Sequence, residues 1–154
     1  MMDVTNPLAL DVQRAIARLM HAIDLRRWAD VANVLAAEVT TDYTSLFGGE
    51  VQRQRRDDLV AGWRTLLTPL DATQHLLGPI DVRPSDQGAA ASCHVRGYHV
   101  RKGAPGGDEW MVAGHYDFAL SQADGAWRIT AITLHTLYQT GNRAVLQQTA
   151  SAGR

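Results

Sequence analysis

The sequence predicts an α+β fold in which a strongly curved antiparallel sheet wraps around N-terminal helices as a cone and leaves an apolar pocket between them. Three observations carry this prediction: apolar residues follow a helical period in the first part of the chain, the period changes to two from Thr73 onward, and the two patterns do not alternate. Because the helices come first and the strands afterwards, the helices cover one face of an antiparallel sheet.

The N-terminal part predicts three helices and one strand. Over residues 7–27, apolar residues recur at steps of three and four, which indicates an amphipathic helix buried on one side. A short helix follows at 28–37, and the β-branched and aromatic residues of 39–47 predict a strand that ends at Gly48 and Gly49. Apolar residues at helical spacing then predict a helix over 52–67, closed by Pro69.

The rest of the chain predicts four long strands, at 73–82, 89–101, 109–122 and 126–138. The segments between them are short and rich in turn-forming residues, so neighbouring strands are antiparallel. Gly97 and Gly114 stand inside two of these strands, where they favour bulges and strong curvature. We expect one domain over residues 7–145 and a C-terminal tail over 146–154.

Composition excludes several function classes. The 15 Lys and Arg residues balance 16 Asp and Glu residues, so the chain lacks the basic excess of a nucleic-acid binder. We see neither a secretory signal nor an apolar run long enough to span a membrane, and we expect a cytoplasmic protein with no membrane partner. Cys93 is the one cysteine, so no internal disulfide forms and no zinc-finger spacing exists.

Some polar residues fall on apolar faces. Strand alternation places His99 on the apolar face of its strand and His115 on the polar face of the next. In the first helix, Asp24 continues an apolar row with a spacing of four. A carboxylate in that row needs a hydrogen-bonding or charged partner, since burying it alone would cost several kcal/mol. By residue type alone, Asp24 could instead cap the second helix. We expect His21, His94 and His135 to be structural or surface residues.

Four blocks of the sequence resemble the SnoaL-like (polyketide-cyclase-like) branch of the nuclear-transport-factor-like superfamily. The blocks are residues 23–28, 41–46, 73–78 and 124–129, and their order and spacing also match. The patterns Asp-x-x-x-Trp, Asp-Tyr and Thr-Gln-His-x-x-Gly are most similar to scytalone dehydratase and its dehydrochlorinase relatives. The similarity extends over about residues 10–138.

The resemblance implies a His–Asp pair at the mouth of the cone, with Asp24 at the end of the first helix and His75 on the first long strand. It also implies that Tyr43 and His99 hold a water molecule or a substrate oxygen. The chain departs from the pattern at Ile23, where the dehydratase has a second pocket tyrosine, and over residues 114–118, which do not reproduce its Ser/Asn pair. These departures argue against scytalone itself as the substrate.

The predicted function is that of a cofactor-independent lyase, of the dehydratase or dehydrohalogenase type, that acts on a small hydrophobic or cyclic molecule. His75 would abstract a proton while Asp24 fixes its tautomer and stabilises the imidazolium. Tyr43 and His99 would polarise a carbonyl or protonate a departing hydroxyl, and neither a metal nor an organic cofactor is expected. Three further side chains are predicted as apolar walls of the pocket: Leu46, Trp63 and Phe118.

Two other functions stay open at the level of the sequence. The same pocket could serve an isomerase or cyclase, in which a proton moves without a leaving group. The fold could also serve as a non-catalytic module that binds a small molecule or assembles with a partner. The largely uncharged sheet face further predicts a homodimer or homotrimer.

Overall fold

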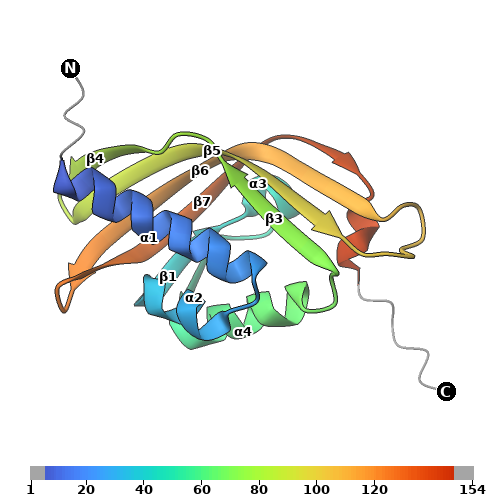
Figure 1. Ribbon diagram of the computed structural model, residues 1–154, viewed down its shortest axis with the longest axis horizontal. Coiled ribbons are helices and arrows are strands. Elements are labelled where there is room, and N and C mark those ends of the chain that lie inside the picture. Colours follow the sequence, from blue (N-terminus) through green and yellow to red (C-terminus); the bar gives the residue numbers. More distant parts are fainter. Residues whose placement is uncertain (1–5, 148–154) are drawn as a thin grey trace.

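The computed structural model describes residues 6–147, in which a helical layer packs against a curved seven-stranded sheet (Figure 1). The helices are α1 (Pro7–Asp24), α2 (Trp28–Val34), α3 (Thr44–Phe47), α4 (Arg56–Leu67) and the 3₁₀ helix η1 (Arg143–Leu146). The strands are β1 (Leu35–Asp42), β2 (Gln52–Arg55), β3 (Ala72–Leu77), β4 (Asp81–Ser85), β5 (Gly88–Val100), β6 (Glu109–Ala123) and β7 (Ala126–Gly141). The predicted α+β class with a curved sheet is confirmed.

The sheet has the strand order β2-β1-β7-β6-β5-β3, and β4 also pairs with β5. The long strands β5, β6 and β7 are joined by short connections and pair antiparallel, as predicted. β1 differs, because it pairs with β7 in parallel. β3 pairs with the C-terminal half of β5 and β4 with its N-terminal half, so β5 supports two short strands in succession.

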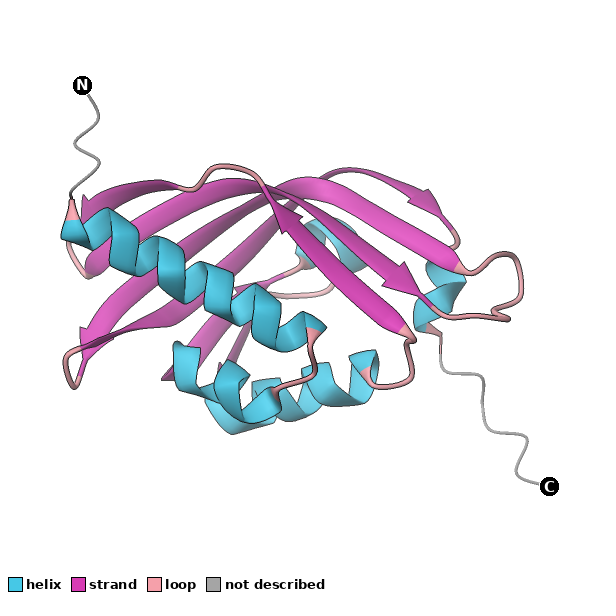
Figure 2. Ribbon diagram, in the orientation of Figure 1, coloured by secondary structure: helices cyan, strands magenta, loops and turns pink. Residues whose placement is uncertain are grey.

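Helix α1 lies along the sheet and supplies much of the core (Figures 1 and 2). The helix begins where Asn6 Oδ1 accepts a hydrogen bond from the Leu8 N–H at 3.1 Å, with Pro7 in the first turn. It ends at Asp24, three residues earlier than predicted. Its apolar stripe is buried, as its spacing predicted, through Val12, Ala15, Ile16, Leu19, Met20, Ala22 and Ile23.

Two segments predicted as single elements divide differently. The predicted strand over 39–47 stops at Asp42, because Asp42 Oδ1 accepts hydrogen bonds from the Thr44 N–H and hydroxyl at 3.0 and 2.7 Å and starts the helical turn α3. Residues 52–55 form strand β2 instead of the first turn of a helix, because they pair with β1 from Glu38 to Thr41. Helix α4 therefore begins at Arg56.

The predicted strand over 73–82 is two strands, β3 and β4, separated at residues 78–80. Pro79 has no N–H to donate to a neighbouring strand, which explains the break. The helix predicted over 28–37 ends at Val34, and β1 begins at the next residue, Leu35. Residues 148–154 of the predicted tail lie outside the described residues, whereas Leu146 packs against the core.

Across residues 6–147, no helix has both the length and the apolar character that a membrane span requires.

Gly114 marks a bulge between β6 and β7, where the register shifts after Ala113. A Cβ atom at this position would lie 2.2 Å from the backbone oxygen of His135. The close approach of the two strands therefore depends on the missing side chain.

We expect Gly114→Ala to lower the free energy of unfolding by at least about 2 kcal/mol, because the strands must separate to admit the methyl group. Gly62→Ala in α4 is the matched control, since no atom lies within 4 Å of its added Cβ. This control should raise stability by roughly 0.5–1 kcal/mol. Urea unfolding followed by circular dichroism measures both changes, and equal midpoints for Gly114→Ala and wild type would contradict the bulge argument.

Candidate active site

The structure brings His75 and Asp24 into direct contact. His75 lies on β3 and Asp24 is the last residue of α1, and the distance from His75 Nδ1 to Asp24 Oδ1 is 2.7 Å. Both side chains are largely buried, with exposed fractions of 12% and 15%. Because a carboxylate only accepts hydrogen bonds, Nδ1 carries the proton and Nε2 of the neutral imidazole has a free lone pair.

Asp24 accepts two further hydrogen bonds. The His75 N–H donates to Oδ2 at 2.7 Å, and the Thr73 hydroxyl donates to Oδ1 at 3.0 Å. The alternative that Asp24 caps α2 is wrong, because that helix starts at an N-cap residue, Arg27, without a side-chain cap. Within residues 6–147, all three hydrogen bonds of the carboxylate therefore go to β3 and hold the end of α1 against the sheet.

These contacts keep Asp24 ionised. Burial alone would raise its pKa, but the hydrogen bonds and the charge of His75, with a smaller contribution from Thr73, outweigh burial and lower the pKa below its ordinary value. An ionised Asp24 can stabilise a positive charge that forms on His75.

Arg26 holds Thr73, the hydroxyl partner of Asp24, in place, and the sequence did not predict this role. Its guanidinium donates to the Thr73 hydroxyl at 2.7 Å and to the backbone oxygens of Ile23 and Leu67 at 3.0 and 3.1 Å. Its backbone has φ of +59°, the left-handed conformation that usually follows a helix end. Arg26 thus links the end of α1, strand β3 and the end of α4.

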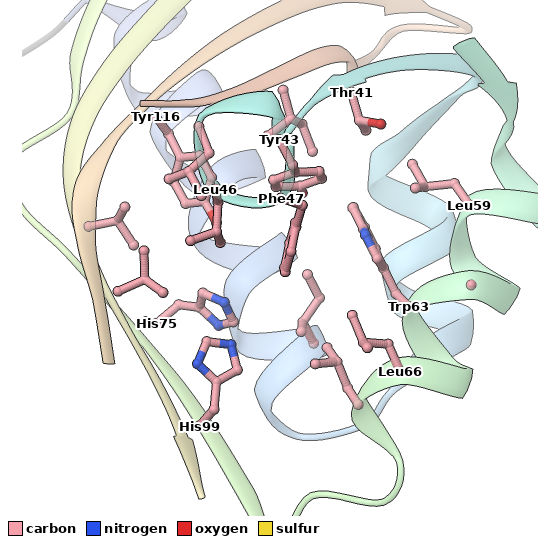
Figure 3. Close-up of a pocket in the computed structure, with 18 of the residues that line it drawn as sticks. Thr41, Tyr43, Leu46, Phe47, Leu59, Trp63, Leu66, His75, His99 and Tyr116 are labelled. Carbon is pink, nitrogen blue, oxygen red and sulfur yellow. The ribbon is translucent and has the colours of Figure 1, made fainter. Parts of the chain in front are cut away.

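His75 borders a cavity of about 360 Å³ between α1, α4 and the inner face of the sheet. Figure 3 shows His75 and His99 on the sheet side of this cavity, with Trp63 and Leu66 of α4 opposite them. Phe47 and Leu66 line the cavity and have exposed fractions of 49% and 36%, so the cavity reaches solvent beside them.

Of the three side chains predicted as apolar walls, two line the cavity and one does not. Leu46 and Trp63 lie in the wall, and Tyr43 lies at the start of α3 near Tyr116 (Figure 3). The prediction for Phe118 is wrong, because it is only 3% exposed and belongs to the core beyond the cavity. Tyr116, two residues earlier on the same face of β6, takes the position in the wall.

His99 lies beside His75, as strand alternation predicted for its inward face. The two ring centroids are 6.1 Å apart, and His99 Nδ1 is 3.3 Å from the backbone oxygen of Trp110. Burial, with a smaller contribution from His75, lowers the pKa of His99 to about 4. His99 is therefore neutral near pH 7, and its Nδ1–H is directed at a carbonyl.

Gly97 separates the two imidazoles. It pairs with His75 across β3 and β5, and an added Cβ would lie 3.5 Å from a ring carbon of each histidine. The absence of a side chain leaves the space between the rings open to a ligand.

Tyr43 and Tyr116 remain protonated over the physiological pH range. Burial raises the pKa of both hydroxyls, and in Tyr116 the nearby Tyr43 raises it further. Neither hydroxyl hydrogen bonds to another group within residues 6–147. Both can therefore donate to a ligand oxygen in the cavity.

The site thus combines an oriented imidazole, a neutral second imidazole and two phenols in an apolar cavity. An imidazole whose Nδ1–H is held by a carboxylate can accept a proton at Nε2. The phenols can stabilise negative charge that develops on an oxygen.

The SnoaL-like domain family matches residues 8–133 of this sequence. Among curated proteins, none matches it. Among solved structures, the Kfla4162 protein from Kribbella flavida is similar, with a TM-score of 0.81 and 25% identity over 89% of this chain and 94% of that chain.

Two further solved structures share the fold. A protein from Novosphingobium aromaticivorans, provisionally named a scytalone dehydratase, has a TM-score of 0.72 and 18% identity over 86% of this chain and 85% of its own. The LinA-type3 hexachlorocyclohexane dehydrochlorinase from Novosphingobium barchaimii has a TM-score of 0.69 and 14% identity over 87% of this chain and 89% of its own. Since the family match extends over most of the chain and the architecture agrees, this protein belongs to the SnoaL-like domain family.

Proposed function

We propose that this protein is a cofactor-independent lyase that removes water or a hydrogen halide from a small cyclic, largely apolar substrate. One observation carries the proposal: His75 Nδ1 lies 2.7 Å from Asp24, while the ring of His75 borders an apolar cavity that reaches solvent. The structural neighbours named as a dehydratase and a dehydrochlorinase support the reaction class.

The reaction begins with proton transfer to His75. Nε2 takes a proton from a carbon next to a carbonyl or next to the carbon that bears the leaving group, and Asp24 stabilises the imidazolium. The electron pair of the broken C–H bond forms a carbon–carbon double bond as the leaving group departs. A halide leaves as an anion, whereas a hydroxyl takes a proton from the imidazolium and leaves as water.

The other polar groups have complementary roles in this proposal. Tyr43 and Tyr116 donate hydrogen bonds to a substrate carbonyl or to the departing oxygen, because their raised pKa keeps them protonated. Neutral His99 accepts a hydrogen bond at Nε2, because its Nδ1–H faces the Trp110 carbonyl. This proposal changes the role expected for His99, from a group that polarises a carbonyl or donates a proton to one that accepts a hydrogen bond. Leu46 and Trp63 enclose the apolar part of the substrate.

The two alternatives predict different observations. An isomerase or cyclase would use the same pair but give a product of unchanged mass. A non-catalytic binding module would be indicated by an occluded pocket, or by His75 and Asp24 lying too far apart for a hydrogen bond. Here the cavity reaches solvent and the pair is in contact. Assembly into a dimer or trimer remains part of this proposal and is open to sedimentation analysis.

We expect His75→Gln and Asp24→Asn each to reduce kcat about 10²- to 10⁴-fold, because the base or its orienting partner is lost. A cyclic β-hydroxy ketone and hexachlorocyclohexane serve as probe substrates, with mass spectrometry detecting loss of water or of hydrogen chloride. His21→Gln, on the exposed side of α1, is the matched control and should retain full activity. Unchanged turnover in His75→Gln would rule out the proposed base, and a product of the same mass would favour the isomerase.

We expect Arg26→Gly to reduce kcat roughly 10- to 100-fold with KM nearly unchanged, because Thr73 and Asp24 lose their support. Glycine tolerates the left-handed backbone at this position, so the helix end is retained. The Nδ1–H proton signal of His75 in the NMR spectrum reports the same change without a substrate. Arg27→Gln, at an exposed ion pair with Asp30, is the control. An unaltered His75 signal in Arg26→Gly would argue against a positioning role.

We expect stability to depend on His99 between pH 6.5 and 4. Because the folded pKa of about 4 lies below the unfolded value of 6.5, only the unfolded chain gains a proton as the pH falls through this window. The His99 contribution is complete above pH 6.5, and about 3 kcal/mol is lost by pH 4. Urea unfolding of wild type and His99→Gln across this window should show wild type losing that much more stability. Parallel stability curves would mean that His99 is not held neutral.

A further inference from the structure

A second cluster of histidines lies on the outer face of the sheet. His94 on β5, His115 on β6 and His135 on β7 occupy directly opposed positions on three neighbouring strands. Asp117 follows His115 by two residues, so its side chain points to the same face. The inward neighbours Tyr116 and Phe118 are buried, which places this cluster on the side away from the cavity.

The side chains of this cluster are in contact with one another. His135 Nε2 is 2.8 Å from Asp117 Oδ2, and the rings of His115 and His135 stack with centroids 4.5 Å apart. One nitrogen of each of these histidines and an Asp117 oxygen all lie within 4.8 Å of one another. An ion pair between His135 and Asp117 would not require His115, whereas a metal ion would use all three groups.

We propose that His115, Asp117 and His135 form a binding site for a divalent transition-metal ion, with Zn²⁺ as the best-suited cation. Imidazole nitrogen and carboxylate oxygen are common zinc ligands, at about 2.0–2.2 Å from the ion. Two such ligands in a tetrahedral site are about 3.3 Å apart, so the ion would replace the proton shared by His135 and Asp117. Three protein ligands leave the fourth position open to water.

The groups around the cluster favour a cation. The Ser92 hydroxyl donates to Asp117 Oδ1 at 2.6 Å, which orients the carboxylate and leaves Oδ2 for the ion. Asp42 on β1, opposite Thr133 of β7, adds a second negative charge close to His135.

The ligands can also adjust to an ion. The side chains of His135 and Asp117 are 45% and 48% exposed, so small rotations can shorten the widest ligand separation. The backbone beneath them is fixed, because His115 and His135 belong to the central strands β6 and β7. The backbone of the site is thus fixed, while the ligand side chains can rotate.

Calorimetric titration of the untagged, chelator-treated 154-residue chain with ZnCl₂ tests the site. We expect one equivalent to bind per chain and saturating zinc to raise Tm by about 5 °C. His115→Gln and His135→Gln should each raise the Kd for zinc at least tenfold and remove most of the Tm shift. Both replaced side chains are partly exposed, so the variants should fold. Circular dichroism without metal checks this.

Pocket variants separate this site from the cavity. His75→Gln and His99→Gln should bind zinc as wild type does, because neither residue touches the outer face. Zinc binding that is lost in His75→Gln but kept in His115→Gln and His135→Gln would overturn the proposal. A stoichiometry of half an equivalent per chain would also overturn it, because the ion would then lie between two copies. The absence of both heat and a Tm shift at millimolar zinc would do the same.

Discussion

The hydrogen bonds of Asp24 are the constraint on which the rest of the site depends. One carboxylate at the end of α1 accepts from the His75 N–H, the His75 ring and the Thr73 hydroxyl, residues about fifty positions away in the sequence. Because the carboxylate is largely withdrawn from water, removing these partners while it stays buried would leave a poorly compensated charge and cost several kcal/mol. The same bonds set the tautomer of His75, so the interaction that fixes the helix on the sheet also leaves Nε2 of the ring free to accept a proton.

The position of β3 depends in turn on β5. Pairing of β3 with the C-terminal half of β5 places His75 opposite Gly97 and Thr73 opposite His99. Because Gly97 has no side chain, the two imidazoles face each other across open space rather than across a methyl group. Neutral His99 can therefore share a ligand with His75 without adding a second positive charge to an apolar cavity.

Local patterns were sufficient to predict the features that depend on periodicity. The apolar row of α1 singled out Asp24, strand alternation placed His99 inside, and family resemblance paired Asp24 with His75. Features set by pairing between elements were not predictable in this way. Strand β2 exists because it pairs with β1, and the parallel pairing of β1 with β7 joins segments about ninety residues apart.

The errors within the site have the same origin. Alternation gives the face to which a side chain points but not which residue of that face reaches the cavity. It therefore predicts Phe118 in the wall, whereas Tyr116 lines the cavity. Arg26 carried no signal in the sequence, because a left-handed arginine after a helix is uncommon and its partners Thr73 and Leu67 lie far along the chain.

The two-residue period of the long strands also separates two kinds of chemistry in a single sheet. Along β6, Tyr116 faces the cavity while His115 and Asp117 face outward, and along β5 His99 faces inward while His94 faces outward. The inner face is apolar, so its imidazoles lose water and His99 becomes a weak base. The outer imidazoles stay in contact with solvent and with a carboxylate, which suits them to bind a cation rather than to remove a proton from carbon. Because the backbone of the sheet lies between the two groups, a side-chain change on one face leaves the chemistry of the other intact.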